Sequence, residues 1–357
     1  MPLQYGWSEE QLLIADSAGK LFADVFSSAA LRVFMRDQVW PEQWRRDLGE
    51  SGLLGICAPV EVGGAAQGAT DALAILIAAG RRAAPWPIAE SIAAAMVLSR
   101  SHPHIARAVM NAETVVAFAT QSLVAVRQGD RWRLSGNLDA VPWANLARWL
   151  LLEVTAEGEK RLALLDLESA GITCETRKSI DPCCPIARVI LNDVSFSSTD
   201  LLSGVERVGH LRTLFAAAEM LGAAQTSLNL AVDYMKVRKQ FGQQIGRFQA
   251  LKHIAANDAL YIESMRLAIE YAAWAHDANA DDAEMALHVA KQYCSQNARS
   301  VAEDSIQCHG GIGFTWDYDL HLYLRRILRL GASLGTAVEH REAIATALIE
   351  QFSRVAR

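Results

Sequence analysis

The spacing of apolar residues changes twice along this chain of 357 residues. Up to about residue 112 they recur every three or four positions, which is the period of an amphipathic helix. From about 113 to 203 they form short runs separated by turn residues, which is typical of β-strands, and from 204 onward helical spacing returns. The pattern predicts an α+β protein with three domains: N-terminal helices (1–112), a middle antiparallel, barrel-like β domain (113–203) and a C-terminal helical bundle (204–357).

The N-terminal region contains clear helix signals. Ser8, followed by Glu9 and Glu10, provides an N-cap hydroxyl with first-turn acids, so we expect one amphipathic helix over 8–36. Further helices are expected to end near residue 50 and to span about 69–84 and 86–100, with Pro103 leading out of the helical region.

The remaining elements follow from the same spacing. Turn signals such as Gln128-Gly129-Asp130 separate the predicted strands. The expected strands are 115–119, 123–126, 131–134, 149–152, 161–165, 171–177 and 189–196. The expected long helices are 208–235, 247–277 and 282–310, and one more helix follows Asp319.

Composition limits the classes of function. Lys and Arg total 34 and Asp and Glu total 40, so the net charge is −6. Because nucleic-acid binding usually needs a basic excess, we expect no nucleic-acid partner. No stretch approaches the ~20 uncharged apolar residues of a membrane span. The N-terminus lacks the features of a secretory signal, so we expect a soluble cytoplasmic protein whose six cysteines are thiols.

Two segments of the C-terminal region carry a specific resemblance. They are Tyr234-Met235-Lys236-Val237-Arg238-Lys239-Gln240-Phe241-Gly242, which continues to 252, and Ile306-Gln307-Cys308-His309-Gly310-Gly311-Ile312-Gly313-Phe314-Thr315. Both resemble the acyl-CoA dehydrogenase family in length and order, and the stretch 53–64 is similar to that family's N-terminal domain. The resemblance implies that family's fold with a C-terminal four-helix bundle, FAD as the cofactor and an acyl-CoA substrate.

The chemistry of the two segments agrees with an FAD site. A planar guanidinium at a helix end, as at Arg238, can hold a diphosphate with two hydrogen bonds. Glycines lack Cβ atoms and let the backbone approach an anionic ligand. In the family these segments reach the ADP part of FAD in a neighbouring subunit. The resemblance implies that the FAD contacts are Arg238, Gln240, Phe241, Gln307, Gly310 and Gly311.

The catalytic base of the family is missing at both of its usual positions. Acyl-CoA dehydrogenation removes the α-proton of a thioester while the β-hydride goes to the flavin, so it needs a carboxylate. The resemblance puts Leu334 at the main base position and Arg212 at the alternative position. Glu219, two helical turns beyond Arg212, is the remaining carboxylate candidate. Its other interpretation is a polar residue bonded to a neighbouring helix.

The β region also departs from the family. The family's flavin-facing strand normally reads Thr-Glu-Pro-Gly-Ala-Gly-Ser-Asp. Here Phe118-Ala119-Thr120-Gln121 leads almost directly into the next strand, so that loop is deleted. The second flavin-facing strand reads Val141-Pro142-Trp143-Ala144-Asn145. The chain keeps the half-site that it would lend to a neighbour and lacks the half-site that it would own.

This division resembles the heteromeric acyl-CoA dehydrogenases that desaturate CoA thioesters of steroid side chains. We therefore expect an FAD-completing subunit of an α2β2 complex, with a homologous partner that supplies the Glu and an electron-transfer flavoprotein as acceptor. Two alternatives stay open: a self-sufficient homo-oligomeric flavoenzyme with a relocated base such as Glu219, and a flavin-free structural or binding module. His309 belongs to the cofactor loop in this interpretation, and the spacing of Cys183-Cys184 predicts no metal site.

Overall fold

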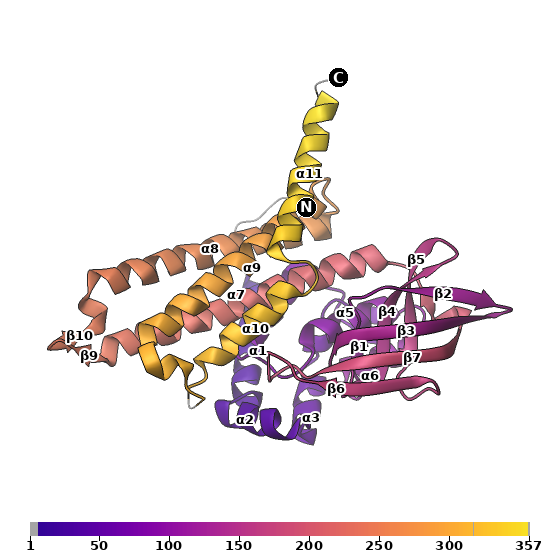
Figure 1. Ribbon diagram of the computed structural model, residues 1–357, viewed down its shortest axis with the longest axis horizontal. Coiled ribbons are helices and arrows are strands. Elements are labelled where there is room, and N and C mark those ends of the chain that lie inside the picture. The colour runs from indigo at the N-terminus through magenta and orange to yellow at the C-terminus, as the bar shows by residue number, and fades with distance from the viewer. Residues whose placement is uncertain (1–5, 317, 356–357) are drawn as a thin grey trace. The chain divides into compact units, whose positions relative to one another are not determined.

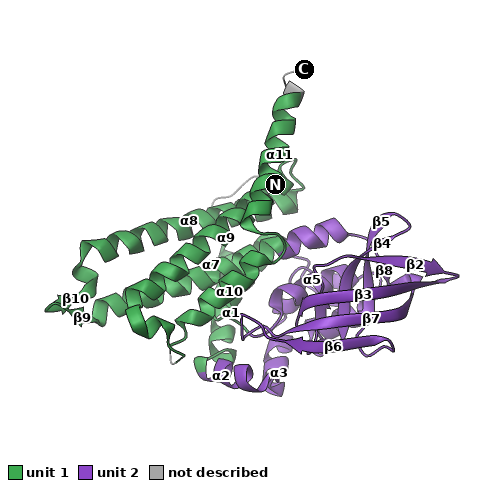
Figure 2. Cartoon of the chain, in the orientation of Figure 1, with its two compact units in different colours: residues 1–28, 69–84, 213–357 green, residues 29–68, 85–212 purple. Residues whose placement is uncertain are grey.

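The structure is a computed structural model that describes residues 6–316 and 318–355 (Figure 1). Its contacts divide the chain into two compact units (Figure 2). One unit combines residues up to 28, 69–84 and 213 onward, and the other combines 29–68 and 85–212. Each unit is therefore built from stretches that are far apart in the sequence. The sequential domain boundaries at 112–113 and 203–204 stay a prediction.

The first unit is mainly helical. Its helices are α1 (Glu9–Val25), α4 (Ala69–Arg81), most of α7 (Val205–Val237), α8 (Gln249–Ala278), α9 (Ala283–His309), α10 (Leu320–Ala332) and α11 (Ala337–Val355). A small hairpin of β9 (Lys239–Gln240) and β10 (Gln243–Gln244) connects α7 to α8. Ser8 caps α1 as predicted, since its Oγ accepts a hydrogen bond from the N–H of Gln11 (3.2 Å). Helix α9 packs against α8, α10 and α11.

Two glycines let α4 and α7 cross at short distance. A Cβ on Gly80 would lie 2.1 Å from the carbonyl oxygen of Glu219, and a Cβ on Gly222 would lie 2.0 Å from that of Ile77. Close-packed interiors leave no room for such overlaps. The crossing therefore requires glycine on both helices.

The start of α4 is capped by a distant part of the chain. The carboxylate of Asp277, near the end of α8, accepts hydrogen bonds from the N–H groups of Ala69 (2.9 Å) and Thr70 (3.0 Å). A carboxylate at a helix N-terminus satisfies unpaired amides and complements the helix dipole. The stretch 69–84 is thereby joined to the C-terminal helices.

The second unit combines short helices with one large sheet. It contains α2 (Ser28–Asp37), α3 (Glu42–Glu50), α5 (Ile88–Leu98), α6 (Pro103–Met110), β1 (Val116–Phe118), β2 (Leu123–Gln128), β3 (Arg131–Pro142), β4 (Trp149–Ala156), β5 (Glu159–Asp166), β6 (Ile172–Arg177), β7 (Ile186–Ser197) and β8 (Leu201–Leu202). The strand order is β6-β7-β3-β2-β4-β5-β8. Strands β1 and β2 both pair with β4 in parallel, so the sheet is mixed rather than wholly antiparallel. Its core includes Leu134, Leu138 and Leu150.

The predicted α+β plan is confirmed, with three local differences among the helices. The segment 8–36 forms two helices, because Phe26 leaves helical geometry (φ −107°, ψ 52°). Pro103 opens α6, since proline's missing N–H costs nothing in a first turn. The region after 319 forms two helices instead of one, because Leu334 and Gly335 take positive φ values (57° and 91°) between α10 and α11.

The cysteines are distributed between the core and the surface. Cys183, Cys184 and Cys294 are buried, whereas Cys174 is exposed. Within the described residues the cysteines form no disulfide. Over those same residues, none of the helices is both long and apolar enough to cross a membrane.

Candidate functional site

The first motif segment follows the C-terminal end of α7. The N–H of Arg238 donates to the carbonyl oxygen of Tyr234 (2.9 Å), which continues the helical hydrogen bonding by one residue. The carbonyl oxygen of Arg238 accepts from the N–H of Ile245 across the hairpin (2.9 Å). Phe241, at the hairpin tip, has a φ of 52° and is 90% exposed. The hairpin thus holds Arg238 and Gln240 at the surface.

The second motif segment begins where α9 ends. Gly310 stops the helix with φ 65° and ψ −145°, a conformation that favours glycine. A Cβ added at Gly310 or Gly311 would meet no atom within 4 Å. Gln307, on the last turn of α9, is also exposed. The backbone of this segment therefore borders open space.

Ring stacking and an apolar cluster join the two segments at one end of the helical unit (Figure 1). The rings of Tyr234 and His309 stack with their centroids 4.5 Å apart. Met235, Ile245 and Cys308 are buried in one apolar cluster. The structure therefore brings to one end the segments that contain Arg238, Gln240, Phe241, Gln307, Gly310 and Gly311.

This end of the unit is an exposed surface. The apolar side chains of Val237, Phe314 and Trp316 are all more than half exposed there (71%, 71% and 59%). A guanidinium and an open glycine backbone are both groups that can bind the negative charge of a diphosphate. An isoalloxazine ring needs flat, enclosed walls, and these segments offer none. This end of the unit is therefore open to solvent on both motif segments.

Leu334, which the resemblance puts at the main base position, lies in the loop between α10 and α11. The carbonyl oxygen of Leu334 accepts a hydrogen bond from Nε2 of His340 (3.0 Å), and that of Gly335 accepts from Nζ of Lys291 (2.9 Å). Burial lowers the pKa of Lys291 to about 8. Side chains of α9 and α11 thus hold the loop, and its Leu334 cannot accept a proton.

Arg212, which the resemblance puts at the alternative base position, is a buried cation. The guanidinium of Arg212 lies over the ring of Phe118, 4.4 Å from the ring centroid. Burial lowers the pKa of Arg212 to about 10, and the carboxylate of Glu90 opposes this shift. The side chain is still charged at neutral pH and cannot act as a base.

The third carboxylate candidate, Glu219, forms a buried ion pair. It is 6% exposed, and its Oε2 lies 3.3 Å from the guanidinium of Arg326 on α10. Arg326 also donates to the carbonyl oxygens of Ala83 (3.2 Å) and Ala84 (3.0 Å). This geometry matches the structural interpretation of Glu219, a polar residue bonded to a neighbouring helix.

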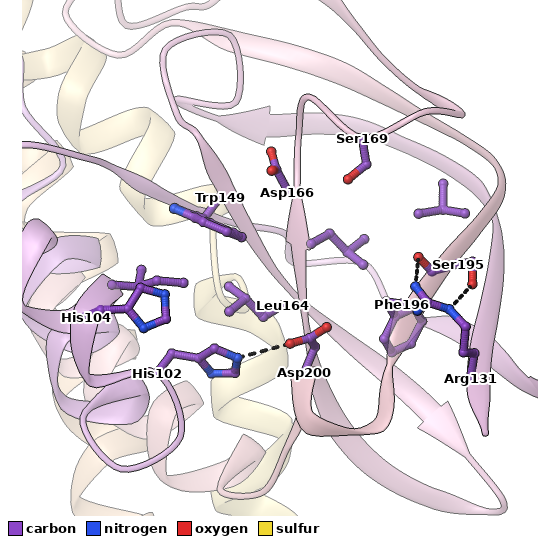
Figure 3. Close-up of a pocket in the computed structure, with 13 residues that line it drawn as sticks. His102, His104, Arg131, Trp149, Leu164, Asp166, Ser169, Ser195, Phe196 and Asp200 are labelled. Carbon is purple, nitrogen blue, oxygen red and sulfur yellow. Dashed lines mark hydrogen bonds and ion pairs between the residues drawn. The ribbon is translucent and has the colours of Figure 1, made fainter.

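A separate cavity of about 270 Å³ lies in the second unit (Figure 3). Nε2 of His102 and Oδ1 of Asp200 lie within hydrogen-bond distance of each other across part of it (3.0 Å). Nε of Arg131 donates to Oγ of Ser195 on another wall (2.7 Å). These polar groups are paired within the protein, and the predicted FAD contacts do not line the cavity.

Sequence reasoning missed a buried acid in the helical unit. Asp258 on α8 is 2% exposed, and its Oδ1 has no hydrogen-bond partner among the described residues. Burial, with a smaller contribution from Asp304, raises the pKa of Asp258 to about 7. A single acid within a helical pattern gives no sequence signal of such burial.

The fold and the two motif segments are those of an acyl-CoA dehydrogenase. Residues 8–103 match the family model described as "Acyl-CoA dehydrogenase, N-terminal domain", and residues 205–349 match "Acyl-CoA dehydrogenase, C-terminal domain". The chain belongs to the acyl-CoA dehydrogenase family. The predicted family, fold, enzyme class (an FAD-dependent oxidoreductase of acyl-CoA) and cofactor are confirmed at this level.

The alignments with individual relatives cover different shares of those relatives' lengths. The acyl-CoA dehydrogenase FadE34 of Mycobacterium tuberculosis is 33% identical over 319 residues, which make up 87% of this chain and 44% of FadE34. The acyl-CoA dehydrogenase IpdE2 of Mycolicibacterium smegmatis is 26% identical, over 89% of this chain and 92% of IpdE2. Among solved structures, a chain of the Tcur3481-Tcur3483 steroid ACAD is 26% identical with a TM-score of 0.90, over 97% of this chain and 99% of that one. The chain thus spans less than half of FadE34.

Proposed function

We propose that this chain is the FAD-completing, non-catalytic subunit of an α2β2 acyl-CoA dehydrogenase that desaturates a CoA thioester between its α and β carbons. One combination of features carries the proposal. The surface with Arg238, Gly310 and Gly311 is open, and the family resemblance puts Leu334 and Arg212, neither of which can act as a base, at the two base positions.

Each predicted contact has a defined role in the proposal. The guanidinium of Arg238 holds the diphosphate of the partner's FAD, and the backbone N–H groups at Gly310 and Gly311 approach the same charge without Cβ interference. Gln240, Phe241 and Gln307 would be further contacts to the ADP part, and Phe241 offers an exposed ring for stacking. When bound, FAD supplies the hydride acceptor. The carboxylate that removes the α-proton comes from the homologous partner.

The proposal also includes a substrate class, an electron acceptor and a location. A steroid side-chain CoA thioester is the proposed substrate class, which the similarity to the Tcur3481-Tcur3483 steroid ACAD supports. An electron-transfer flavoprotein is the proposed acceptor of electrons from FAD, and the cytoplasm is the proposed location. Residues 204–357 form the proposed domain for FAD and oligomer contacts.

Co-expression with a homologous chain that carries the Glu tests the proposal. We expect a yellow complex that contains two FAD for every four chains and reduces a dye with an acyl-CoA. Arg238→Ala is expected to weaken FAD binding by about tenfold to a hundredfold, because a charged hydrogen-bonding group is lost. Arg299→Ala is the matched control, since Arg299 is an exposed arginine paired with Glu303 on α9. It should leave the FAD content unchanged.

Two results would overturn this assignment. A yellow, active homo-oligomer of this chain alone would make it a self-sufficient flavoenzyme, and loss of its turnover in Glu219→Gln would then identify the base. Unchanged FAD content of the complex in Arg238→Ala would instead favour a flavin-free structural or binding module.

A further inference from the structure

His309 occupies the junction between the two segments that carry the predicted FAD contacts. It is the last residue of α9 and lies directly before Gly310. Its side chain is 4% exposed and contacts three parts of the helical unit. The ring stacks on Tyr234, whose carbonyl oxygen receives the N–H of Arg238. The ring of Tyr318 lies on another side, with its centroid 4.9 Å away.

The hydrogen bonds of His309 define one tautomer. Nδ1 lies 2.7 Å from the carbonyl oxygen of Ser305, which can only accept, so Nδ1 carries the hydrogen. Burial lowers the pKa of His309, so the ring is neutral at neutral pH. Nε2 is then an acceptor, and the hydroxyl of Tyr318 donates to it (3.2 Å). Both ring nitrogens are thereby used.

These contacts connect three stretches of chain. Tyr234 belongs to the last turns of α7, His309 ends α9, and Tyr318 follows the short helical segment η5 (Gly310–Phe314). The hairpin and the glycine segment are otherwise exposed, with Phe241 90% and Phe314 71% exposed. The stack and the hydrogen bonds therefore limit how far the two segments can move apart.

We propose that His309 is a positioning residue that holds the Arg238 segment and the Gly310-Gly311 segment at the separation needed for both to reach one FAD diphosphate. This inference rests on the proposed function. His309 itself does not touch FAD. It acts through Tyr234 on one side and through its covalent link to Gly310 on the other.

The experiment measures the dissociation constant of FAD from the complex with the catalytic homologue, by titrating flavin into the flavin-free complex. We expect Tyr318→Phe and His309→Phe to weaken FAD binding about three- to tenfold, the range for a lost neutral hydrogen bond. His309→Gln should restore most of the affinity, because its Oε1 can accept from Tyr318. Tyr271→Phe is the matched control, since it removes a hydroxyl bonded to Asp282 near the far end of α8.

A double-mutant cycle separates positioning from general stability. If His309 acts through the placement of Arg238, Tyr318→Phe should have a much smaller effect in an Arg238→Ala background than alone. Full additivity, or an unchanged dissociation constant in both Tyr318→Phe and His309→Phe while Arg238→Ala loses FAD, would overturn this inference and leave the proposed function standing. If Arg238→Ala left the dissociation constant of FAD unchanged, both this inference and the proposed function would be wrong.

Discussion

The two halves of α7 have opposite surroundings. In the first half Glu219 is buried in an ion pair and Gly222 lies against the backbone of α4. At the other end Arg238 and the hairpin are exposed. One helix therefore combines a closed region, in which Glu219 is paired with Arg326, with an open end whose charged side chains face solvent.

This contrast shows that the same residue type, arginine, has a different role at each end of the helix. An arginine at the open end is available to a ligand, whereas Arg326 at the closed end is committed to Glu219 and two backbone carbonyls. Buried charges are kept where partners surround them, and exposed charges are free to bind. The open end is thus the better candidate for function, although both regions contain charged residues.

The largest expected effect concerns the closed end. Arg326→Met should destabilise the protein by about 3–5 kcal/mol, because the carboxylate of Glu219 would remain buried without its cation. Urea unfolding followed by circular dichroism measures this change. The double variant Arg326→Met with Glu219→Leu should recover most of the loss. Unchanged stability of Arg326→Met would break the contrast between the two halves of α7.

Asp258 should make stability depend on pH. Its pKa of about 7 in the folded protein exceeds the ordinary value of 3.8, so the folded state binds the proton more tightly. The stabilisation is complete below about pH 4 and is lost as the pH rises through 7. Asp258→Asn should therefore be more stable than the natural protein at pH 8, on the order of 4 kcal/mol, and close to it in stability at pH 4. Asp16→Asn, at an exposed residue, is the control.

Two glycine variants compare the closed and open regions directly. Gly222→Ala should destabilise by about 1–3 kcal/mol, because its Cβ would lie 2.0 Å from the carbonyl oxygen of Ile77. Gly311→Ala adds the same methyl group where no atom lies within 4 Å, so its melting temperature should stay unchanged. Of the two variants, only Gly311→Ala should weaken FAD binding by the complex with the catalytic homologue. A lower melting temperature for Gly311→Ala would show that this segment is packed.

The smallest expected effect is at the main base position. Leu334→Glu supplies the missing carboxylate, yet the isolated variant should show no dehydrogenase activity with acyl-CoA and dye. The family resemblance implies that the flavin-facing loop before Leu123 is deleted, and a base alone does not create a flavin site. Measurable flavin-dependent turnover of the isolated chain would mean that it owns a complete site.

The features that could be predicted depend on residues that lie close together in the sequence. The segments around Arg238 and Gly310 have fixed short spacings, so their sequence identified both the family and the cofactor. The assignment of Leu334 to the main base position stays a prediction, which rests on the neighbouring Gly335-Thr336. Each of these signals lies within about twenty residues of chain.

The features that escaped prediction depend on residues far apart in the sequence. The partner of Glu219 lies 107 residues away on α10, and no local pattern joins them. The parallel pairing of β1 and β2 with β4 is likewise set by tertiary contacts, since hydrophobic alternation does not report strand direction. The break at Phe26 is likewise not marked by the spacing of apolar residues, which continues through it.

The insertion of α4 into the helical unit has a consequence for synthesis. The ribosome makes residues 69–84 long before Gly222, Asp277 and Arg326, the groups that pack, cap and bind this stretch. Until these residues have been synthesised, α1 is the one described helix of the same unit against which α4 can pack. The largely apolar helix α4 therefore lacks most of its packing partners during most of translation. Such nascent chains are aggregation-prone, so this protein should depend on chaperones that shield early helices.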